Sequence, residues 1–90
     1  MKKCYIITFE LKNPGLNRDK IIAEIKTASC VRVSADAYLI TSHNDSVTIR
    51  DILLKHLFQG DKIYVGKLDN FAAWYGLDTN TSNWITGNQK

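Results

Sequence analysis

The chain has 90 residues, the length of a single domain, which excludes multidomain enzymes and large catalytic barrels. Apolar residues make up 44% and charged residues 23%, values typical of a globular domain, so the composition argues against intrinsic disorder. Lys and Arg number 12 against 9 Asp and Glu, and the resulting net charge of +3 is compatible with nucleic-acid binding without indicating it.

The first predicted element is a strand over residues 4–11, which are rich in β-branched and aromatic side chains and end before the turn Asn13-Pro14-Gly15. Alternate side chains of a strand point to opposite faces. One face is wholly apolar and consists of Tyr5, Ile7, Phe9 and Leu11, whereas the other is mixed and consists of Cys4, Ile6, Thr8 and Glu10. We therefore expect the apolar face to meet a core and the face of Glu10 to point away from it.

A helix is predicted over residues 17–28. Asn17 is a favourable N-cap, and Asp19 lies in the first turn, where the helix dipole favours an acid. Apolar residues recur at helical spacing and would form one buried stripe: Ile21, Ile22, Ile25 and Ala28.

Two short strands, over residues 30–33 and 37–41, are predicted to form a hairpin through the turn Ser34-Ala35-Asp36. A second helix follows, and we expect Gly60 to end it. Its N-cap candidates are Asn44, Asp45 and Ser46, and its apolar stripe consists of Ile49, Ile52, Leu53 and Leu57.

Residues 61–68 read as a fourth strand, so the order is strand, helix, strand, strand, helix, strand. Two right-handed crossovers of this kind predict an α+β, ferredoxin-like βαββαβ fold: a four-stranded antiparallel sheet with both helices on one face. We assign residues 1–69 to this domain. Residues 70–90 form an aromatic C-terminal extension, which we expect to pack on its own sheet or on a partner subunit.

The two cysteines, Cys4 and Cys30, have no Cys-x-x-Cys spacing. This favours reduced thiols in a cytoplasmic protein, with a disulfide between them as the alternative. The charged start Met1-Lys2-Lys3 precedes an apolar stretch that is too short for an export signal or a membrane span, so we expect no membrane association. His43 and His56 have no local signature that links them to a nucleophile.

Glu10 ends the first strand on its less apolar face, where a carboxylate can bind a divalent cation if a twofold axis brings a second copy opposite it. The alternative is a solvated strand-end acid. Lys12, Arg18 and Lys20 surround the start of the first helix and can meet a phosphate backbone, or they are ordinary surface residues. Tyr38 and Tyr64 can stack on bases or pack in the core.

Several segments, in order, resemble one protein family. The opening Tyr5-Ile-Ile-Thr-Phe-Glu-Leu11 with Asn13-Pro14-Gly15 resembles that of small proteins labelled SinR-like, which are similar to the CRISPR-associated small endonucleases and to virulence-associated protein D. Further similar segments are Ala37-Tyr38-Leu39-Ile40, Ile49-Arg50-Asp51 with Leu53 and Leu57, Asp61-Lys-Ile-Tyr-Val65, Trp74 before Gly76, and Trp84. Together they extend over nearly the whole chain.

The resemblance implies a ferredoxin-like homodimer that binds nucleic acid, with the C-terminal segment adding to the partner's sheet. In the nuclease relatives an aspartate at the end of the first strand, one per subunit, binds a divalent metal at the dimer axis. Glu10 occupies that position here, so the implied cofactor is Mg²⁺ or Mn²⁺. The longer glutamate side chain displaces the carboxylate, and Mg²⁺ requires near-ideal geometry. Asp36-Ala37 also stands where relatives often carry Ser-Thr.

These departures weaken the case for catalysis, and three hypotheses follow. The first is a homodimeric protein that binds RNA or DNA with weak or no nuclease activity, through Lys12, Arg18, Lys20 and Tyr38. The second is a protein-interaction adaptor or small-ligand sensor with no nucleic-acid role. The third is a divalent-metal-dependent ribonuclease, deoxyribonuclease or toxin in which Glu10 is the catalytic and metal-binding residue.

Overall fold

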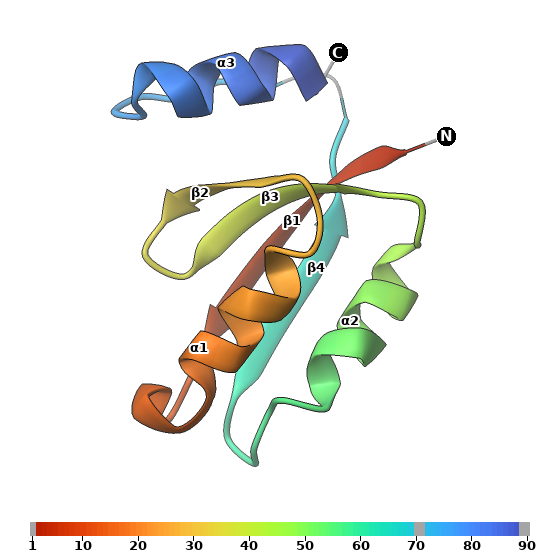
Figure 1. Cartoon of the computed structure of the whole chain (residues 1–90), viewed down its shortest axis with the longest axis vertical. Coiled ribbons are helices and arrows are strands. Elements are labelled where there is room, and N and C mark those ends of the chain that lie inside the picture. Colours follow the sequence, from red (N-terminus) through yellow and green to blue (C-terminus); the bar gives the residue numbers. More distant parts are fainter. Residues whose placement is uncertain (1, 70–71, 89–90) are drawn as a thin grey trace.

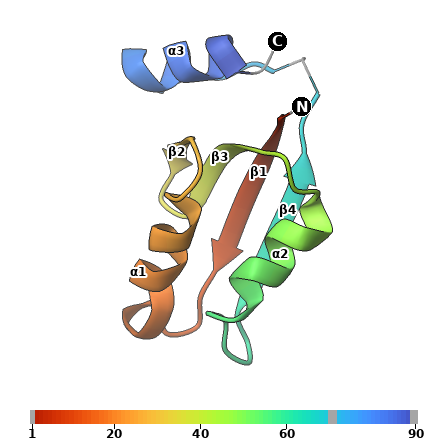
Figure 2. The same cartoon turned by 45° about the vertical axis from the view of Figure 1, so that its right-hand side comes forward.

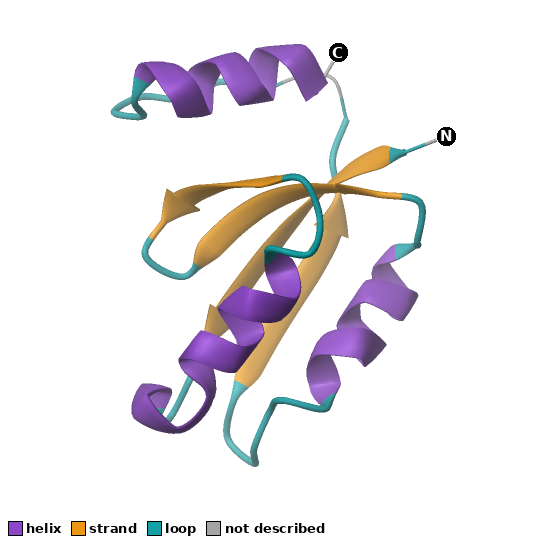
Figure 3. Cartoon of the chain, in the orientation of Figure 1, coloured by secondary structure: helices purple, strands orange, loops and turns teal. Residues whose placement is uncertain are grey.

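The computed structural model describes residues 2–69 and 72–88. These residues form, in chain order, β1 (Lys3–Glu10), α1 (Pro14–Ile25), β2 (Cys30–Ser34), β3 (Ala37–Ser42), α2 (Ser46–Leu54), β4 (Lys62–Lys67) and α3 (Thr79–Asn88). Figure 3 shows these elements coloured by type. The first six follow the predicted order.

The four strands form one sheet in the order β2-β3-β1-β4, and all neighbours are antiparallel. The connections β1–α1–β2 and β3–α2–β4 place both helices on the same face of the sheet (Figure 1). The predicted ferredoxin-like α+β fold is therefore confirmed. None of the helices in the described part of the chain has the length and apolarity that crossing a membrane requires.

The core lies between the sheet and these two helices. Tyr5, Ile7 and Phe9 of β1 point into it, which confirms the predicted apolar face of this strand. The other buried members of the core are Leu11, Ile21, Ile25, Tyr38, Ile40, Ile49 and Leu53. Burying one Leu, Ile or Phe side chain contributes about 1.5–3 kcal/mol to the free energy of folding. The core between the sheet and the two helices therefore supplies much of the stability of the domain.

The face of the sheet away from α1 and α2, the outer face, is partly covered by the C-terminal segment. Ile6 and Leu39, which are directly opposite each other in the β1–β3 ladder, lie on this face. Together with Trp74, Leu77 and Ile85 they line an apolar cleft of about 230 Å³. α3 runs alongside β2, apart from α1 and α2 (Figure 2). The C-terminal segment therefore packs on the sheet of its own chain.

The predicted start of the first helix is wrong by one turn. The helix begins at Pro14, and Asn13 occupies the N-cap position without a capping hydrogen bond from its side chain. Proline is well suited to the first helical position because its fixed φ matches the helix and its missing N–H would have no partner there. Asn17 is therefore inside α1, where its side chain is 3% exposed and makes tertiary contacts instead of a cap.

The second helix also differs from the prediction at its end. Asp45 is the N-cap, and its carboxylate accepts the Thr48 N–H at 2.8 Å, but the helix stops at Leu54 and does not continue toward Gly60. The carboxylate of Asp61 accepts the Phe58 N–H at 2.8 Å, and Gly60 adopts a φ of +93°. A tight turn that glycine favours thus replaces the last helical turns.

The helix α3 lies within the segment that the sequence predicts only as an aromatic extension, and its Thr, Asn, Ser and Gly residues are poor helix formers. Asp78 caps this helix, since its carboxylate accepts the Thr81 N–H at 2.7 Å. The Trp84 indole N–H donates to Ser29 Oγ at 3.0 Å, which fixes α3 beside the α1–β2 loop. The predicted domain boundary falls at residues 69 and 70, and residues 70 and 71 of the aromatic segment lie outside the described residues.

Candidate nucleic-acid interface

Four residues at one end of β1 and β4 form a solvent-facing surface on the outer face of the sheet. Glu10 lies directly opposite Lys62, and Thr8 lies directly opposite Tyr64. All four side chains share the outer face, because Ile7, Phe9, Ile63 and Val65 between them point toward the core. We call Thr8, Glu10, Lys62 and Tyr64 the outer platform.

Tyr64 is the aromatic member of the outer platform, and it is 65% exposed. Its ring lies along β4 over Gly66: a Cβ built on Gly66 would be only 2.8 Å from Tyr64 Cε1. Because glycine has no side chain at this strand position, the Tyr64 ring can lie directly against the backbone. An aromatic ring held this way can accept a planar group on its exposed side.

Lys12 is a second exposed lysine at this end of the sheet. Its backbone N–H donates to Asp61 Oδ1 at 2.9 Å, and its side-chain methylenes pass over Gly60, whose added Cβ would lie 3.1 Å from Lys12 Cδ. Because Lys62 follows Asp61, the two lysines belong to one loop cluster at this end of the sheet. Lys62 also pairs with Glu10, with Nζ 3.6 Å from Oε1, and both side chains are 78% exposed.

Asp61 holds this loop cluster together. Besides Lys12, its carboxylate accepts the Phe58 N–H at 2.8 Å and the Asn17 Nδ2–H at 2.9 Å. Asn17 Nδ2 also donates to the His56 carbonyl at 2.7 Å. The backbone hydrogen bonds from Phe58 and Lys12, and then the Asn17 amide, lower the pKa of Asp61 because they stabilise its ionised form. The loops that carry Lys12 and Lys62 are thereby fixed relative to each other.

Lys12, Arg18 and Lys20, which the sequence places together around the start of the first helix, do not form one surface in the structure. Arg18 Nε lies 3.0 Å from Asp36 Oδ1, and its Nη2 donates to the Ala35 carbonyl at 2.8 Å, so Arg18 ties α1 to the β2–β3 hairpin. Lys20 is exposed on α1, which covers the opposite face of the sheet. Lys12 is the one of the three that adjoins the outer platform.

The assignment of Tyr38 to nucleic-acid binding is wrong, because its side chain is 4% exposed and belongs to the core. A base cannot reach a ring that is buried between the sheet and the helices. Tyr64 is the strand tyrosine that remains accessible. The alternation of side chains along β4 indicates that Tyr64 is accessible: Ile63 and Val65 face the core, so Tyr64 between them faces the other side.

Glu10 has the position expected of a strand-end acid, and its partner is a lysine amine. The described residues contain no group of three or more His, Cys, Asp or Glu side chains that could hold a metal ion. A Mg²⁺ or Mn²⁺ site at Glu10 would therefore need further oxygen ligands from outside the described part of this chain, such as a second copy of Glu10.

The two cysteines are free thiols on opposite faces of the sheet. Cys4 lies opposite Thr41 on the outer face, whereas Cys30 lies opposite Ile40 on the core face. Because the two side chains point to opposite sides of the sheet, their orientation does not allow a disulfide in this fold. Burial raises the pKa of both thiols. Because the thiolate is the reactive form, neither residue is activated as a nucleophile.

No family model matches the chain, and no curated protein matches it. Among solved structures, the chain is similar to the hypothetical protein TT1823 from Thermus thermophilus, with a TM-score of 0.70 and 15% sequence identity. The alignment covers 86% of this chain and 94% of that one. The likeness therefore extends over nearly all of both chains, and at this identity it shows a shared fold.

Proposed function

We propose that this protein is a homodimeric nucleic-acid-binding protein that binds single-stranded RNA or DNA at the outer platform, with weak or no cleavage. The observation that carries the proposal is the exposed ring of Tyr64 over Gly66, with Lys62 two positions before it on the same strand face and Lys12 hydrogen-bonded to Asp61 just before β4. Single-stranded nucleic acid is bound by this combination, in which bases stack on aromatic rings and amines contact phosphates.

The charges near the platform favour weak rather than tight binding. Lys62 and Lys12 provide two positive charges, and Glu10 offsets one of them. Few phosphate contacts give a shallow dependence of affinity on salt, with each contact to a single strand contributing about −0.7 to the slope of log K against log salt. Base stacking on Tyr64 should therefore contribute a large part of the affinity.

The homodimer part of the proposal is supported by the β4 side of the molecule. Among the described residues, β4 is an edge strand that pairs with β1 alone, so its other edge has no strand partner there. α2, which contacts β4, and the loop that follows it expose Leu54 and Phe58, which are 46% and 58% exposed. Such an edge with apolar neighbours suits a second copy of the chain.

The test is a titration of a fluorescently labelled oligothymidylate or oligouridylate, followed by fluorescence anisotropy at fixed salt. We expect Tyr64→Ala to weaken binding about tenfold, the effect of losing one stacked base. Tyr64→Phe should retain most of the affinity, because it keeps the ring. Lys62→Ala and Lys12→Ala should each lower the salt slope by about 0.7.

The matched controls are Tyr75→Ala, which removes a fully exposed tyrosine outside the platform, and Lys20→Ala, which removes an exposed amine on α1. Both should leave affinity unchanged. Equal binding by wild type and Tyr64→Ala would refute the platform. Cleavage of RNA or DNA with Mg²⁺ or Mn²⁺ that Glu10→Ala abolishes would favour the nuclease hypothesis instead.

A further inference from the structure

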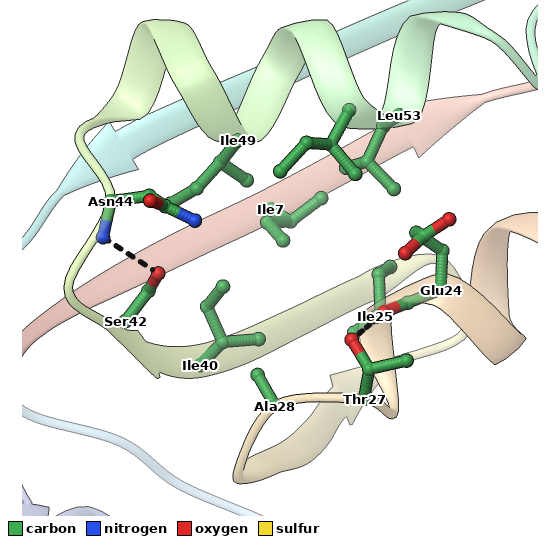
Figure 4. Close-up of a pocket in the computed structure, with 11 residues that line it drawn as sticks. Ile7, Glu24, Ile25, Thr27, Ala28, Ile40, Ser42, Asn44, Ile49 and Leu53 are labelled. Carbon is green, nitrogen blue, oxygen red and sulfur yellow. Dashed lines mark hydrogen bonds between the residues drawn. The ribbon is translucent and has the colours of Figure 1, made fainter.

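A narrow cleft of about 130 Å³ opens between α1 and α2, on the face of the sheet opposite the outer platform. Figure 4 shows its floor and walls, which are aliphatic: Ile7 of β1, Ile40 of β3, Ile25 of α1, and Ile49 and Leu53 of α2. These five side chains belong to the buried core. The middle of the cleft is therefore lined by side chains of the core, which suits an apolar ring.

Asn44 lies at one end of the cleft, and Figure 4 shows its carboxamide directed toward the aliphatic walls. Its backbone N–H donates to Ser42 Oγ at 3.0 Å, which fixes the turn. Asn44 is exposed at the mouth of the cleft, and its carboxamide has no protein hydrogen-bond partner within residues 2–69 and 72–88. An amide presents a donor and an acceptor side by side, so it can pair with an N–H and a C=O that are adjacent in a ligand.

Glu24 lies at the other end. Its Oε1 is 3.2 Å from His56 Nε2 and 3.2 Å from Lys55 Nζ, so its charge is already compensated. The hydrogen bond from His56 and then that from Lys55 lower the pKa of Glu24, which keeps it an acceptor. The Thr27 hydroxyl donates to the Glu24 backbone carbonyl at 2.7 Å and closes this end. The cleft thus has an apolar middle and a polar group at each end.

We propose that this cleft binds one uncharged six-membered heterocyclic ring with an amide edge, the chemistry of a pyrimidine base. The volume is of the same order as the roughly 150 Å³ of an apolar protein cavity that admits benzene, so we expect one ring to fill the cleft better than a fused purine. A charged ligand is disfavoured because the floor is apolar and the charge of Glu24 is already neutralised. The free carboxamide of Asn44 selects the amide edge.

This inference does not depend on the proposed function, because the cleft and the outer platform lie on opposite faces of the sheet. The shared chemistry has two sources: a free base or nucleoside, and a base extruded from a nucleic-acid strand. The experiment separates them from each other and from binding at Tyr64.

The test is a titration of the ¹⁵N-labelled full chain with uracil, followed by ¹H–¹⁵N correlation spectra. We expect saturable shifts at the backbone amides of Ala28, Asn44 and Ile49. Asn44→Ala should weaken uracil binding about tenfold, the loss of one paired amide contact. His43→Ala changes the neighbouring exposed residue, which does not line the cleft, and should have no effect. Tyr64→Ala should also leave uracil binding unchanged.

Toluene and adenine are the comparison ligands. Toluene has the ring without the amide edge, and adenine has a fused second ring, so both should bind at least tenfold more weakly than uracil. Equal affinity for uracil and toluene, with no effect of Asn44→Ala, would show an apolar cavity without selectivity and overturn the proposal. Shifts confined to other residues would overturn it as well.

An oligothymidylate identifies the source of the ring. If it shifts the amides of the cleft and uracil competes with it, the ligand is a base within a strand. If uracil binds and the oligonucleotide leaves these amides unshifted, the ligand is a free base or nucleoside. Either result supports the amide-edged ring as the ligand chemistry.

Discussion

At the scale of single residues, a hydrogen bond joins Asn17 of α1 to Asp61, which is 44 positions later in the sequence. Asn17 is buried in α1, and both hydrogens of its amide are used, one by Asp61 and one by the His56 carbonyl. Asp61 also accepts the backbone N–H groups of Lys12 and Phe58. These contacts hold the backbone of Lys12 beside Asp61, so the position of Lys12 relative to the outer platform depends on one carboxylate.

Asp61 should therefore make the stability of the fold depend on pH in the acidic range. Its pKa is lower in the folded chain than its ordinary value of about 3.9, so its ionised form stabilises the fold above that pH. This stabilisation is lost as the pH falls through the folded-state pKa. Asp61→Asn should lower the midpoint of thermal unfolding at pH 7, and the difference from wild type should shrink as the pH falls below 4.

Circular dichroism melts between pH 2 and pH 7 measure this effect. The matched control is Asp19→Asn, since Asp19 is exposed on α1 and has no hydrogen-bond partner among the described residues. That variant should follow the wild-type curve more closely at every pH. A difference between Asp61→Asn and wild type that stays constant with pH would show that the ionised carboxylate is not the stabilising form.

At the scale of elements, α3 is the weakest part of the described fold. Its sequence has poor helix propensity, and Ile85 is its one buried residue. The cleft of about 230 Å³ beneath it also leaves part of the sheet without close contact. An element with few buried apolar contacts opens at a lower free energy than the core strands and helices.

Tryptophan fluorescence measures this element selectively, because Trp74 and Trp84 are the two tryptophans of the chain. We expect the fluorescence transition in urea to occur at a lower concentration than the main far-ultraviolet circular dichroism transition. Ile85→Ala should lower the fluorescence midpoint further by removing about 2 kcal/mol or more of docking energy, and the main transition should change little. Coincident transitions in both proteins would mean that α3 unfolds with the core.

These elements also show how far the sequence predicts the structure. Strand alternation and helical spacing placed β1, the hairpin, and Ile49 and Leu53 of α2 correctly, because those signals reflect burial along a regular element. The other two residues of the predicted stripe differ, since Ile52 is 37% exposed and Leu57 lies beyond the end of α2. The local sequence predicts a helix cap at Asn17, because nothing near it in the sequence shows that Asp61 lies beside it. α3 was missed because docking of Ile85 against the sheet outweighs low propensity, which local patterns do not report.

In the candidate sites, too, the features that depend on local sequence could be predicted, and those that depend on tertiary contacts could not. The exposed position of Tyr64 could be derived from the alternation of β4 once its pairing with β1 was assumed, whereas the burial of Tyr38 required knowing which face of β3 meets the helices. Arg18 looked available because its partner Asp36 comes from the hairpin, 18 residues later. The cleft between α1 and α2 depends on how far apart two helices pack, and no sequence pattern specifies that.

At the scale of the whole molecule, the proposed homodimer is the prediction on which the arrangement of the platforms depends. A chain of 90 residues buries only about two thirds of the surface it exposes when unfolded, so a second copy adds a substantial fraction to its core. Light scattering after size-exclusion chromatography should give a mass near twice 10.2 kDa. The ratio of absorbance at 260 and 280 nm on the same peak reports any bound nucleic acid.

If β4 and α2 form the dimer surface, a charge placed there should separate the subunits. Phe58→Lys and Leu54→Lys add an amine to apolar side chains next to the β4 edge, and both should shift the measured mass toward 10.2 kDa at micromolar concentration. Leu16→Lys is the matched control, because Leu16 is 63% exposed on α1. A dimer that survives both substitutions would place the interface on another face. A wild-type protein that is monomeric at every concentration would refute the homodimer. A metal site shared by two copies of Glu10 would then be impossible as well.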